Sequence, residues 1–318
     1  MRIGTRGSAL ARWQAETVAR LIAGAGGPPT ELVVIRTSGD ESSTESSRPP
    51  DAAAPETVAV KRLFVKEIEE ALLDKRIDLA VHSSKDLPAA LPDGLRLAAT
   101  LPREDPRDAI VLPATSTAHG WDAVSAELGD GATIGTSSVR RIAALRVAFP
   151  AAAFRPIRGN VDTRLRKLDA GDCSALVLAA AGLMRLGRAA RISALIPVEI
   201  MVPAPGQGII AIEIADDAPS EVRDVVSRLS DPDAWDALVA ERAVVHALGG
   251  GCQLPLGVLA RVDGQAIDIT GVVTSLDGAR VVRASVRGNR GGAAAAGEKL
   301  ANALIAAGAA EILIHSRP

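Results

Sequence analysis

Three polar clusters in the sequence each follow a short apolar segment. They are residues 5–8 (TRGS), 82–86 (HSSKD) and 136–141 (TSSVRR). Ligands of open α/β sheets bind beyond the carboxyl ends of the strands, so the clusters are expected to converge on one cleft between two domains. The third cluster also opens a predicted helix, where unpaired backbone N–H groups and the helix dipole favour an anion. The pattern therefore predicts a binding site for an anionic small molecule.

The charged residues of these clusters include Asp86, Arg140 and Arg141. A carboxylate at Asp86 can stabilise a cation or accept an N–H, and a simple turn cap is the alternative. The two arginines can hold a carboxylate bidentately, although a solvated helix face with Ser138 as N-cap would contain the same residues. A second arginine-rich stretch, 157–168 (IRGNVDTRLRKL), favours the binding role. Asp86 is therefore a candidate catalytic carboxylate, and the arginines are candidate ligands of an anion.

The two cysteines differ in their surroundings. Cys252 lies in GGGCQLP. The three glycines can adopt backbone dihedral angles that other residues disfavour, and they have no side chains that would cover the thiol. A thiolate there can attack an electrophile or carry a covalent group, and a structural cysteine is the alternative. Cys173, which precedes an apolar strand, is interpreted as a packing residue. Neither cysteine belongs to a CxxC motif and the four histidines lack metal-ligand spacing, so no metal site is predicted.

The composition narrows the class of protein and of ligand. A chain of 318 residues with 47% apolar and 23% charged residues is expected to form two or three globular domains. Its net charge is −2, yet residues 134–191 contain eleven Lys or Arg against three acids. Aromatic residues make up 2% and Tyr is absent, so platforms for stacking nucleic-acid bases are scarce. A small polyanion fits this segment better than nucleic acid does.

The sequence also bears on cellular location. The longest apolar run, 175–184, is far shorter than the roughly twenty residues that a membrane-spanning helix needs. Residues 1–13 lack the apolar stretch of a signal peptide. Two lone thiols in such a chain are expected to be reduced. We therefore expect a cytoplasmic protein.

Alternating strand-like and helix-like segments must position the polar clusters. In the first part of the chain, strands are predicted at 2–5, 31–37, 78–81, 95–99 and 109–112, with helices at 8–23 and near 64–72 and a mobile loop at 38–60. A second unit begins near residue 133, where IGTSSVRR echoes the IGTRGSAL at residue 3. It contains predicted strands at 154–157 and 175–179 and a helix near 161–169. The alternation predicts two α/β domains with mainly parallel sheets.

A different pattern follows residue 231. A helix is predicted at 234–248, three alternating strands at 258–262, 266–274 and 280–287, and a last helix at 293–307. Asp-Gly pairs at 263 and 277 are typical of tight hairpin turns. This part is therefore predicted to be an α+β domain with a three-stranded antiparallel sheet.

Several stretches of the sequence together resemble the porphobilinogen deaminase family. They are TRGSALARWQ, LFVKEIEEALL, DLAVHSSKDLP, EDPRDA, IGTSSVRR, IRGNVDTRLRKL, LAAAGLMRLG, PAPGQG and ERAVVHALGGGCQLPLG. They occur in the family's order from the N-terminus to about Gly257, and the remaining residues match by general pattern alone.

The resemblance implies that four porphobilinogen molecules are joined head to tail into hydroxymethylbilane, with release of ammonia, in heme biosynthesis. It also implies a dipyrromethane cofactor, made of two porphobilinogen units and bound by a thioether to Cys252. Asp86 matches the catalytic aspartate, which interacts with pyrrole N–H groups and stabilises the cationic azafulvene formed as ammonia leaves. Each pyrrole carries an acetate and a propionate, which agrees with the arginine excess.

The same motif matching implies two sets of binding residues. The set expected at the cofactor, besides Cys252, is Ser83, Lys85, Ser138, Arg140, Arg141, Arg164 and Arg185. The set expected at the substrate is Arg6, Ser8, Lys61, Phe64, Arg158 and Gln207. Phe64 is expected to stack near the reacting pyrrole, and Gln207 to lie at a crossover between domains.

The family's architecture implies two similar periplasmic-binding-protein-like α/β domains around a cleft, followed by the α+β domain, in a monomer. Domain 1 would contain residues 1–104 and 206–230, domain 2 residues 105–205, and domain 3 residues 231–318. The sequence departs from the family at 59–62, where AVKR stands in place of the usual Gly-Gly-Lys-Gly, and at Gly7, where Gln is usual. The loop that contains Lys61 is therefore expected to close over the cleft differently from that of the family.

Two other functions share some of these features. A solute-binding module would also have two α/β domains and arginines for an anionic ligand, but it leaves the placement of Cys252 and Asp86 unexplained. A nucleic-acid-binding protein could use the basic segment 134–191, but the scarcity of aromatic residues disfavours it. Intact mass separates these functions, because only the enzyme carries a dipyrromethane adduct.

Overall fold

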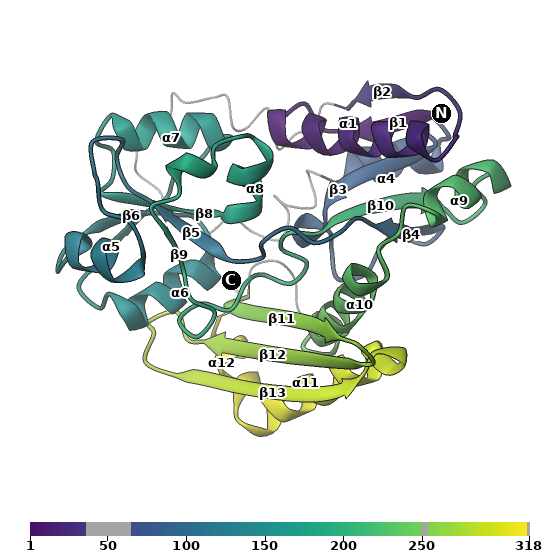
Figure 1. Cartoon of the computed structure of the whole chain (residues 1–318). Coiled ribbons are helices and arrows are strands. Elements are labelled where there is room, and N and C mark those ends of the chain that lie inside the picture. Colours follow the sequence, from purple (N-terminus) through teal and green to yellow (C-terminus); the bar gives the residue numbers. More distant parts are fainter. Residues whose placement is uncertain (36–64, 250–253, 317–318) are drawn as a thin grey trace. The chain divides into compact units, whose positions relative to one another are not determined.

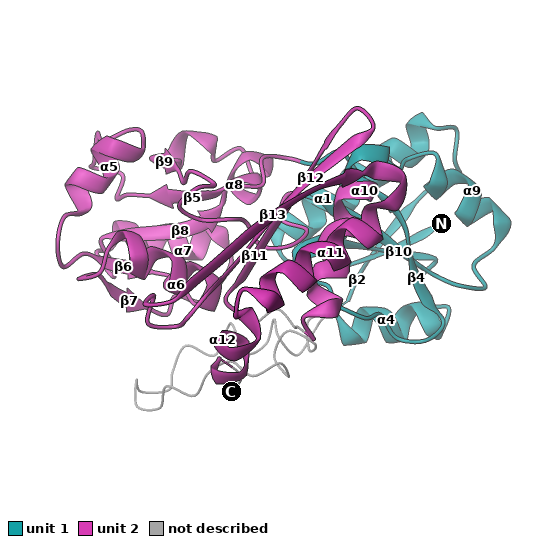
Figure 2. Ribbon diagram, turned by 90° about the horizontal axis from the view of Figure 1, so that it is seen from below, with its two compact units in different colours: residues 1–103, 209–235, 318 teal, residues 104–208, 236–317 magenta. Residues whose placement is uncertain are grey.

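The computed structural model describes residues 1–35, 65–249 and 254–316. Lys61, Phe64, Cys252 and the predicted loop at 38–60 lie outside the described residues. The chain divides into two compact units: unit 1 contains residues 1–103 and 209–235, and unit 2 contains residues 104–208 and 236–316 (Figure 2). The predicted three-domain boundaries stay a prediction.

Unit 1 is built on a five-stranded sheet in the order β2-β1-β3-β10-β4 (Figure 1). The strands are β1 (Arg2–Thr5), β2 (Glu31–Val34), β3 (Leu79–Ser83), β4 (Leu95–Thr100) and β10 (Ile210–Ala215). β1 pairs in parallel with β2 and β3, whereas β10 runs antiparallel to β3 and β4. The sheet is therefore mixed, and the strand that makes it so joins the sheet from a distant part of the sequence.

Helices cover both faces of this sheet. They are α1 (Ala9–Gly24), α4 (Lys66–Leu73) and α9 (Ser220–Ser227). One face carries Leu79 and Val81 and shares a core with α1 and α9, and the other carries Ala80 and packs with Ile68 and Leu72 of α4. Successive residues of β3 thus reach opposite faces, as the pleat of a strand requires. A 3₁₀ turn, η1 (Ser84–Asp86), follows β3 directly.

Unit 2 repeats this topology in a second sheet of order β7-β6-β8-β5-β9. Its strands are β5 (Asp108–Val111), β6 (Thr133–Gly135), β7 (Ala153–Arg155), β8 (Ala175–Ala179) and β9 (Ala194–Leu195). β6 is parallel to β7 and β8, and β5 is antiparallel to β8 and β9, which is the pairing pattern of the first sheet. The predicted pair of similar α/β domains is confirmed, but the prediction of mainly parallel sheets is wrong.

The helices of this part of unit 2 also lie on both faces of their sheet. They are α5 (Trp121–Leu128), α6 (Val139–Ala148), α7 (Val161–Asp169) and α8 (Ala180–Arg185), with the short 3₁₀ turn η2 (Ala189–Arg191). Side chains of α5 and α6 share one core with β6 and β8, and side chains of α7 and α8 share another with β5 and β8. In the sequence, α6 follows β6 and α7 follows β7, and both strands belong to this sheet.

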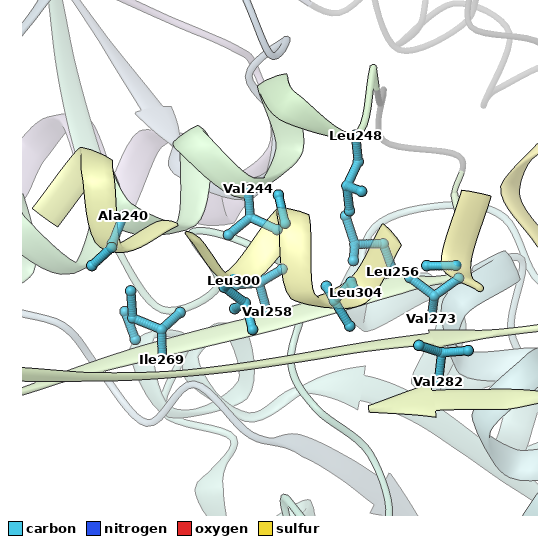
Figure 3. Packing of buried hydrophobic residues seen from close by; sticks show 14 of the residues in the cluster. Ala240, Val244, Leu248, Leu256, Val258, Ile269, Val273, Val282, Leu300 and Leu304 are labelled. Atoms are coloured by element: carbon cyan, nitrogen blue, oxygen red, sulfur yellow. The ribbon is translucent and has the colours of Figure 1, made fainter. Parts of the chain in front are cut away.

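A three-stranded antiparallel sheet completes unit 2, as predicted. Its strands are β11 (Leu256–Asp263), β12 (Ala266–Thr274) and β13 (Val281–Asn289), and the helices nearby are α10 (Pro232–Ala247), α11 (Ala293–Ala306) and α12 (Ala309–His315), with η3 (Arg290–Gly292). Val244, Val258, Leu300 and Leu304 meet in its core (Figure 3). Among the described helices, none is long and apolar enough to cross a membrane.

Candidate active site

Asp86 ends the turn η1, immediately after the carboxyl end of β3. Its side chain is half-buried, and within the described part of the chain its carboxylate makes neither a hydrogen bond nor an ion pair. The turn is closed without it, because the backbone N–H of Leu87 donates to the carbonyl of Ser84 at 3.2 Å. The carboxylate of Asp86 therefore does not cap the turn, and it remains available to a ligand.

The residues around Asp86 in unit 1 are held more firmly. Ser83 Oγ accepts from Gln14 Nε2 at 2.8 Å, and the buried Gln14 belongs to α1. Ser8 is the N-cap of α1, and its hydroxyl accepts from the backbone N–H of Ala11 at 3.2 Å. Arg6 and Lys85 are half-buried. The structure therefore gives Ser8 and Ser83 structural bonds in addition to the ligand contacts expected from the sequence.

In unit 2 a buried carboxylate joins the two adjacent arginines of α6. Asp108 is fully buried, and Arg140 and Arg141 are each 7% exposed. Arg141 Nε donates to Asp108 Oδ1 at 2.9 Å, and Arg140 Nη1 lies 2.8 Å from Asp108 Oδ2. The backbone carbonyls of Val202 and Val177 accept from Arg140 Nη1 and Arg141 Nη1, at 2.8 and 2.9 Å. The arginines do not form a solvated helix face.

Within this cluster of Asp108, Arg140 and Arg141, positive charges outnumber negative ones. Two guanidinium groups carry two positive charges, and Asp108 supplies one negative charge. Burying charge is costly unless it is paired and hydrogen-bonded. Arginine also presents donors in a planar fork that matches a carboxylate. The cluster is therefore suited to accept a further carboxylate from a ligand.

Ser138 and Gln207 lie beside this cluster. Ser138 is the residue before α6, but its hydroxyl makes no capping hydrogen bond, so the simple N-cap interpretation is not supported. Gln207 is 1% exposed, and its Nε2 donates to the Pro106 carbonyl at 2.7 Å and to Asp108 Oδ1 at 3.1 Å. Gln207 thereby ties two segments of unit 2 together, 104–108 and 202–208, and its place at a crossover between domains stays a prediction.

The remaining predicted arginines of unit 2 differ in exposure. Arg185 is half-buried, and its Nη2 donates to the Gly208 carbonyl at 2.6 Å. Burial lowers its pKa, and the nearby carboxylate of Glu104 opposes this shift. Arg164 Nε donates to the Gly159 carbonyl at 2.7 Å, whereas Arg158 is exposed.

The sheet topology explains why these residues gather within each unit. In unit 1 the parallel strands β1 and β3 end next to each other, so residues 6–8 and 83–86 follow at one edge of the sheet. In unit 2 the parallel strands β6, β7 and β8 end at one edge, and Asp108 begins β5 opposite Ala179, the last residue of β8. Both sets thus lie at carboxyl edges, as predicted. Convergence of the two sets on one cleft stays a prediction.

Sequence reasoning missed three residues that organise these edges: Gln14, Asp108 and Glu241. Glu241 lies on α10 and is fully buried, and its carboxylate accepts from the backbone N–H groups of Gly206 at 2.5 Å and Ala260 at 2.7 Å. A polar residue within an otherwise apolar face was the available signal for each. In the described residues, no group of three or more His, Cys, Asp or Glu side chains is placed to hold a metal ion.

Comparison with known proteins agrees with the motif pattern. Residues 1–223 match the family model described as "Porphobilinogen deaminase, dipyromethane cofactor binding domain", and residues 235–306 match "Porphobilinogen deaminase, C-terminal domain". A porphobilinogen deaminase of Bordetella parapertussis is 45% identical over 99% of this chain and 96% of its own length. One of Acidithiobacillus ferrooxidans is 44% identical over 98% of this chain and 97% of its own length.

Solved structures with a similar backbone are much more distant. The second substrate-binding domain of a putative amino acid ABC transporter from Streptococcus pneumoniae is 11% identical, with a TM-score of 0.44 over 78% of this chain and 94% of that one. A likeness of this degree implies no function. The two family models and the full-length relatives show that this chain belongs to the porphobilinogen deaminase family.

Proposed function

We propose that this chain carries out the reaction of its family with Asp86 as the catalytic carboxylate. In that reaction a transferase joins four porphobilinogen molecules head to tail into hydroxymethylbilane and releases ammonia, as a step of tetrapyrrole biosynthesis. The observation that carries the assignment of Asp86 is its half-buried carboxylate, which makes no hydrogen bond or ion pair with any described residue and follows a strand end. A carboxylate so placed is available to a substrate.

The work of Asp86 is electrostatic. Loss of ammonia leaves positive charge on the pyrrole, and a carboxylate about 4 Å away attracts that charge by about 4 kcal/mol at an effective dielectric constant near 20, before desolvation is subtracted. The same oxygens can accept the pyrrole N–H. Because the cation exists only after ammonia begins to leave, this attraction favours the transition state over the bound substrate.

The residues of unit 2 fit a dipyrromethane cofactor. The donor set contains Ser138, whose hydroxyl caps no helix, and Arg140, Arg141 and Arg185, which are buried or half-buried. The three arginines carry three positive charges and Asp108 one negative charge, and acetate and propionate groups would add negative charge beside the guanidinium groups. When bound by a thioether to Cys252, the dipyrromethane supplies the end to which new pyrrole units are joined.

The other predicted contacts remain part of this proposal. Ser83, Lys85 and Arg164 are assigned to the cofactor, and Arg6, Ser8, Lys61, Phe64, Arg158 and Gln207 to the substrate. Arg158 is exposed, so it stays charged in water without a desolvation cost. It is therefore suited to bind the carboxylates of the last pyrrole units that enter the site. Gln207 is assigned a supporting role, because its amide already bonds within the protein.

Asp86→Asn tests the catalytic assignment. The substitution keeps the shape and removes the charge, so we expect intact mass to show the cofactor adduct while the rate of hydroxymethylbilane formation falls by about 10²–10³-fold. Asp93→Asn is the matched control, because Asp93 is an exposed aspartate of the same unit. A rate for Asp86→Asn equal to that of Asp93→Asn would remove Asp86 from the catalytic role.

We also propose that the enzyme is a cytoplasmic monomer that acts on porphobilinogen and binds no nucleic acid. Attachment of the cofactor requires a free thiol at Cys252. The cytoplasm keeps thiols reduced, which supports this location. The 2% content of aromatic residues argues against base stacking. Light scattering of the cofactor-loaded protein tests the monomer, and a dimer mass at micromolar concentration would contradict it.

A further inference from the structure

A buried histidine and glutamate lie on the strand that leads to Asp86. His82 is the second-last residue of β3 and 6% exposed, and Glu213 on the neighbouring strand β10 is fully buried. His82 Nε2 lies 3.0 Å from Glu213 Oε2. We propose that His82 and Glu213 together are positioning residues for Asp86, an inference that rests on the catalytic role proposed for Asp86.

The strand register places the two side chains on one face of the sheet. His82 is opposite Ala211, and Ala80 is opposite Glu213, so these four residues share a face. His82 and Glu213 are diagonal neighbours, within reach of long side chains. The pairing of β10 with β4 shifts register between Ile212 and Glu213, an irregularity of the kind that re-aims a side chain and is frequent beside active sites. β3 and β10 run side by side in Figure 1.

Stability alone does not account for this pair. The face that carries it packs on α4 with an apolar core of Ile68, Ala71 and Leu72. Replacing a buried ionic or polar pair by apolar residues is often neutral or stabilising. Moreover, Glu213 Oε1 is buried and has no hydrogen-bond partner among the described residues, which costs about 1–3 kcal/mol. Burying this polar pair costs free energy, and its histidine lies four residues before Asp86. Both facts point to a role of the pair in function.

The His82–Glu213 pair is one of several interactions among the described residues that fix the end of β3. On the α4 face, His82 is bonded to Glu213, and on the opposite face, Ser83 is bonded to Gln14 of α1. In the plane of the sheet, the backbone N–H of Ser84 donates to the Ile209 carbonyl at 3.0 Å. The turn η1 then leads to Asp86, whose own carboxylate has no bond to any described residue. The direction of that carboxylate therefore depends on how firmly residues 82–84 are held.

Positioning of this kind is worth a large factor in rate. A displacement of about 1 Å at the reacting groups can reduce the rate of an enzyme by about 10²-fold. We expect Glu213→Leu to lower kcat by about 10- to 100-fold with KM changed less than about 2-fold, because binding contacts remain while Asp86 loses its fixed direction. Glu213→Gln keeps an oxygen that accepts from the His82 N–H, and it should retain most of the activity.

A double-mutant cycle tests the proposal. Glu213→Leu is combined with Asp86→Asn, and kcat is measured on protein whose cofactor adduct has been verified by intact mass. If Glu213 acts through Asp86, the double variant is no slower than Asp86→Asn alone. If the two losses multiply, the pair acts independently of Asp86 and the proposal is overturned.

Further variants keep the outcome unambiguous. Asp78→Asn is the matched control, because Asp78 precedes the other end of β3 and is paired there with Arg2 at 2.6 Å, so it should lower stability without lowering kcat. If Glu213→Leu does not fold, His82→Gln replaces it in the cycle, with the same expectation. A wild-type rate for Asp86→Asn overturns the catalytic assignment, whereas a slow Asp86→Asn with multiplying losses overturns the positioning role alone.

Discussion

Asp108 offers a direct test of how unit 2 holds its arginines. Its carboxylate is fully buried and interacts with Arg140, Arg141 and Gln207 at distances of 2.8 to 3.1 Å. Asp108→Asn removes the charge while leaving the shape nearly unchanged. Two buried guanidinium groups then lose the negative charge between them, and the remaining amide brings its own donors toward them.

The size of the effect follows from the burial of this cluster. Removing one partner of a buried ion pair costs about 3–5 kcal/mol, because the other charge stays buried without compensation. For a unit of about 150–250 residues, each kcal/mol lowers Tm by about 2–4 °C, so the expected decrease is about 6–20 °C. That loss is a large part of the roughly 5–15 kcal/mol by which folded proteins are stable.

Asp105→Asn provides the matched control for this measurement. Asp105 pairs with Arg107 at 2.6 Å, but the Arg107 side chain is 39% exposed. Partly exposed pairs contribute at most about 1 kcal/mol, which predicts a decrease in Tm of less than about 4 °C. Thermal unfolding followed by circular dichroism, on both variants and the parent, gives the comparison. If Asp108→Asn melts within about 2 °C of Asp105→Asn, the reasoning about the buried cluster is refuted.

Three further predictions follow from individual residues. Cys252→Ser should fold but show only the mass of its chain, and a dipyrromethane adduct on that variant would contradict the attachment site. Cys173 is buried, and burial raises the pKa of its thiol, so a thiol reagent should not modify it in the native Cys252→Ser protein; rapid labelling there would contradict its packing. Burial would raise the pKa of Asp78, but hydrogen bonds from the side chain and backbone of Arg2 lower it further than burial raises it. The pair therefore stabilises the fold fully above about pH 4, and this stabilisation is lost as the pH falls through the lowered pKa of Asp78. Asp78→Asn should reduce the denaturant midpoint at pH 7, and the difference from the parent should shrink as the pH is lowered below about 4. A difference that does not change with pH would show that the charge does not matter.

The local elements of the fold were predictable from sequence patterns. Helix α7 and strand β8 have the predicted bounds of 161–169 and 175–179, because apolar periodicity and turn residues act over a few positions. Strand β10 was not predicted, although it completes the first sheet and carries Glu213. Its run IAIEIA is buried in all but its last residue, and a short apolar run does not by itself distinguish a strand from a buried helix.

The candidate site was predictable in chemistry more than in contacts. Asp86 and the arginines 140 and 141 were found from their charge and from their place after strand-like segments. The bonds of Ser8 to its own helix and of the arginines to Asp108 were not predicted. In the second case the partners are 32 and 33 residues apart in the sequence, and no local pattern links them.

The sequence by itself determined the family, the reaction and the residues that can do its chemistry, because motifs are local and side-chain type sets charge and reactivity. Tertiary structure alone decided which charges are buried together and which hydroxyls are engaged in caps. It also decided that the carboxylate of Asp86 makes no bond to any described residue, while His82 and Glu213 meet on the strand that leads to Asp86. The physical reason is that burial and pairing depend on strands brought together from distant parts of the chain. The free energy of a charged group is set by those neighbours and not by its place in the sequence.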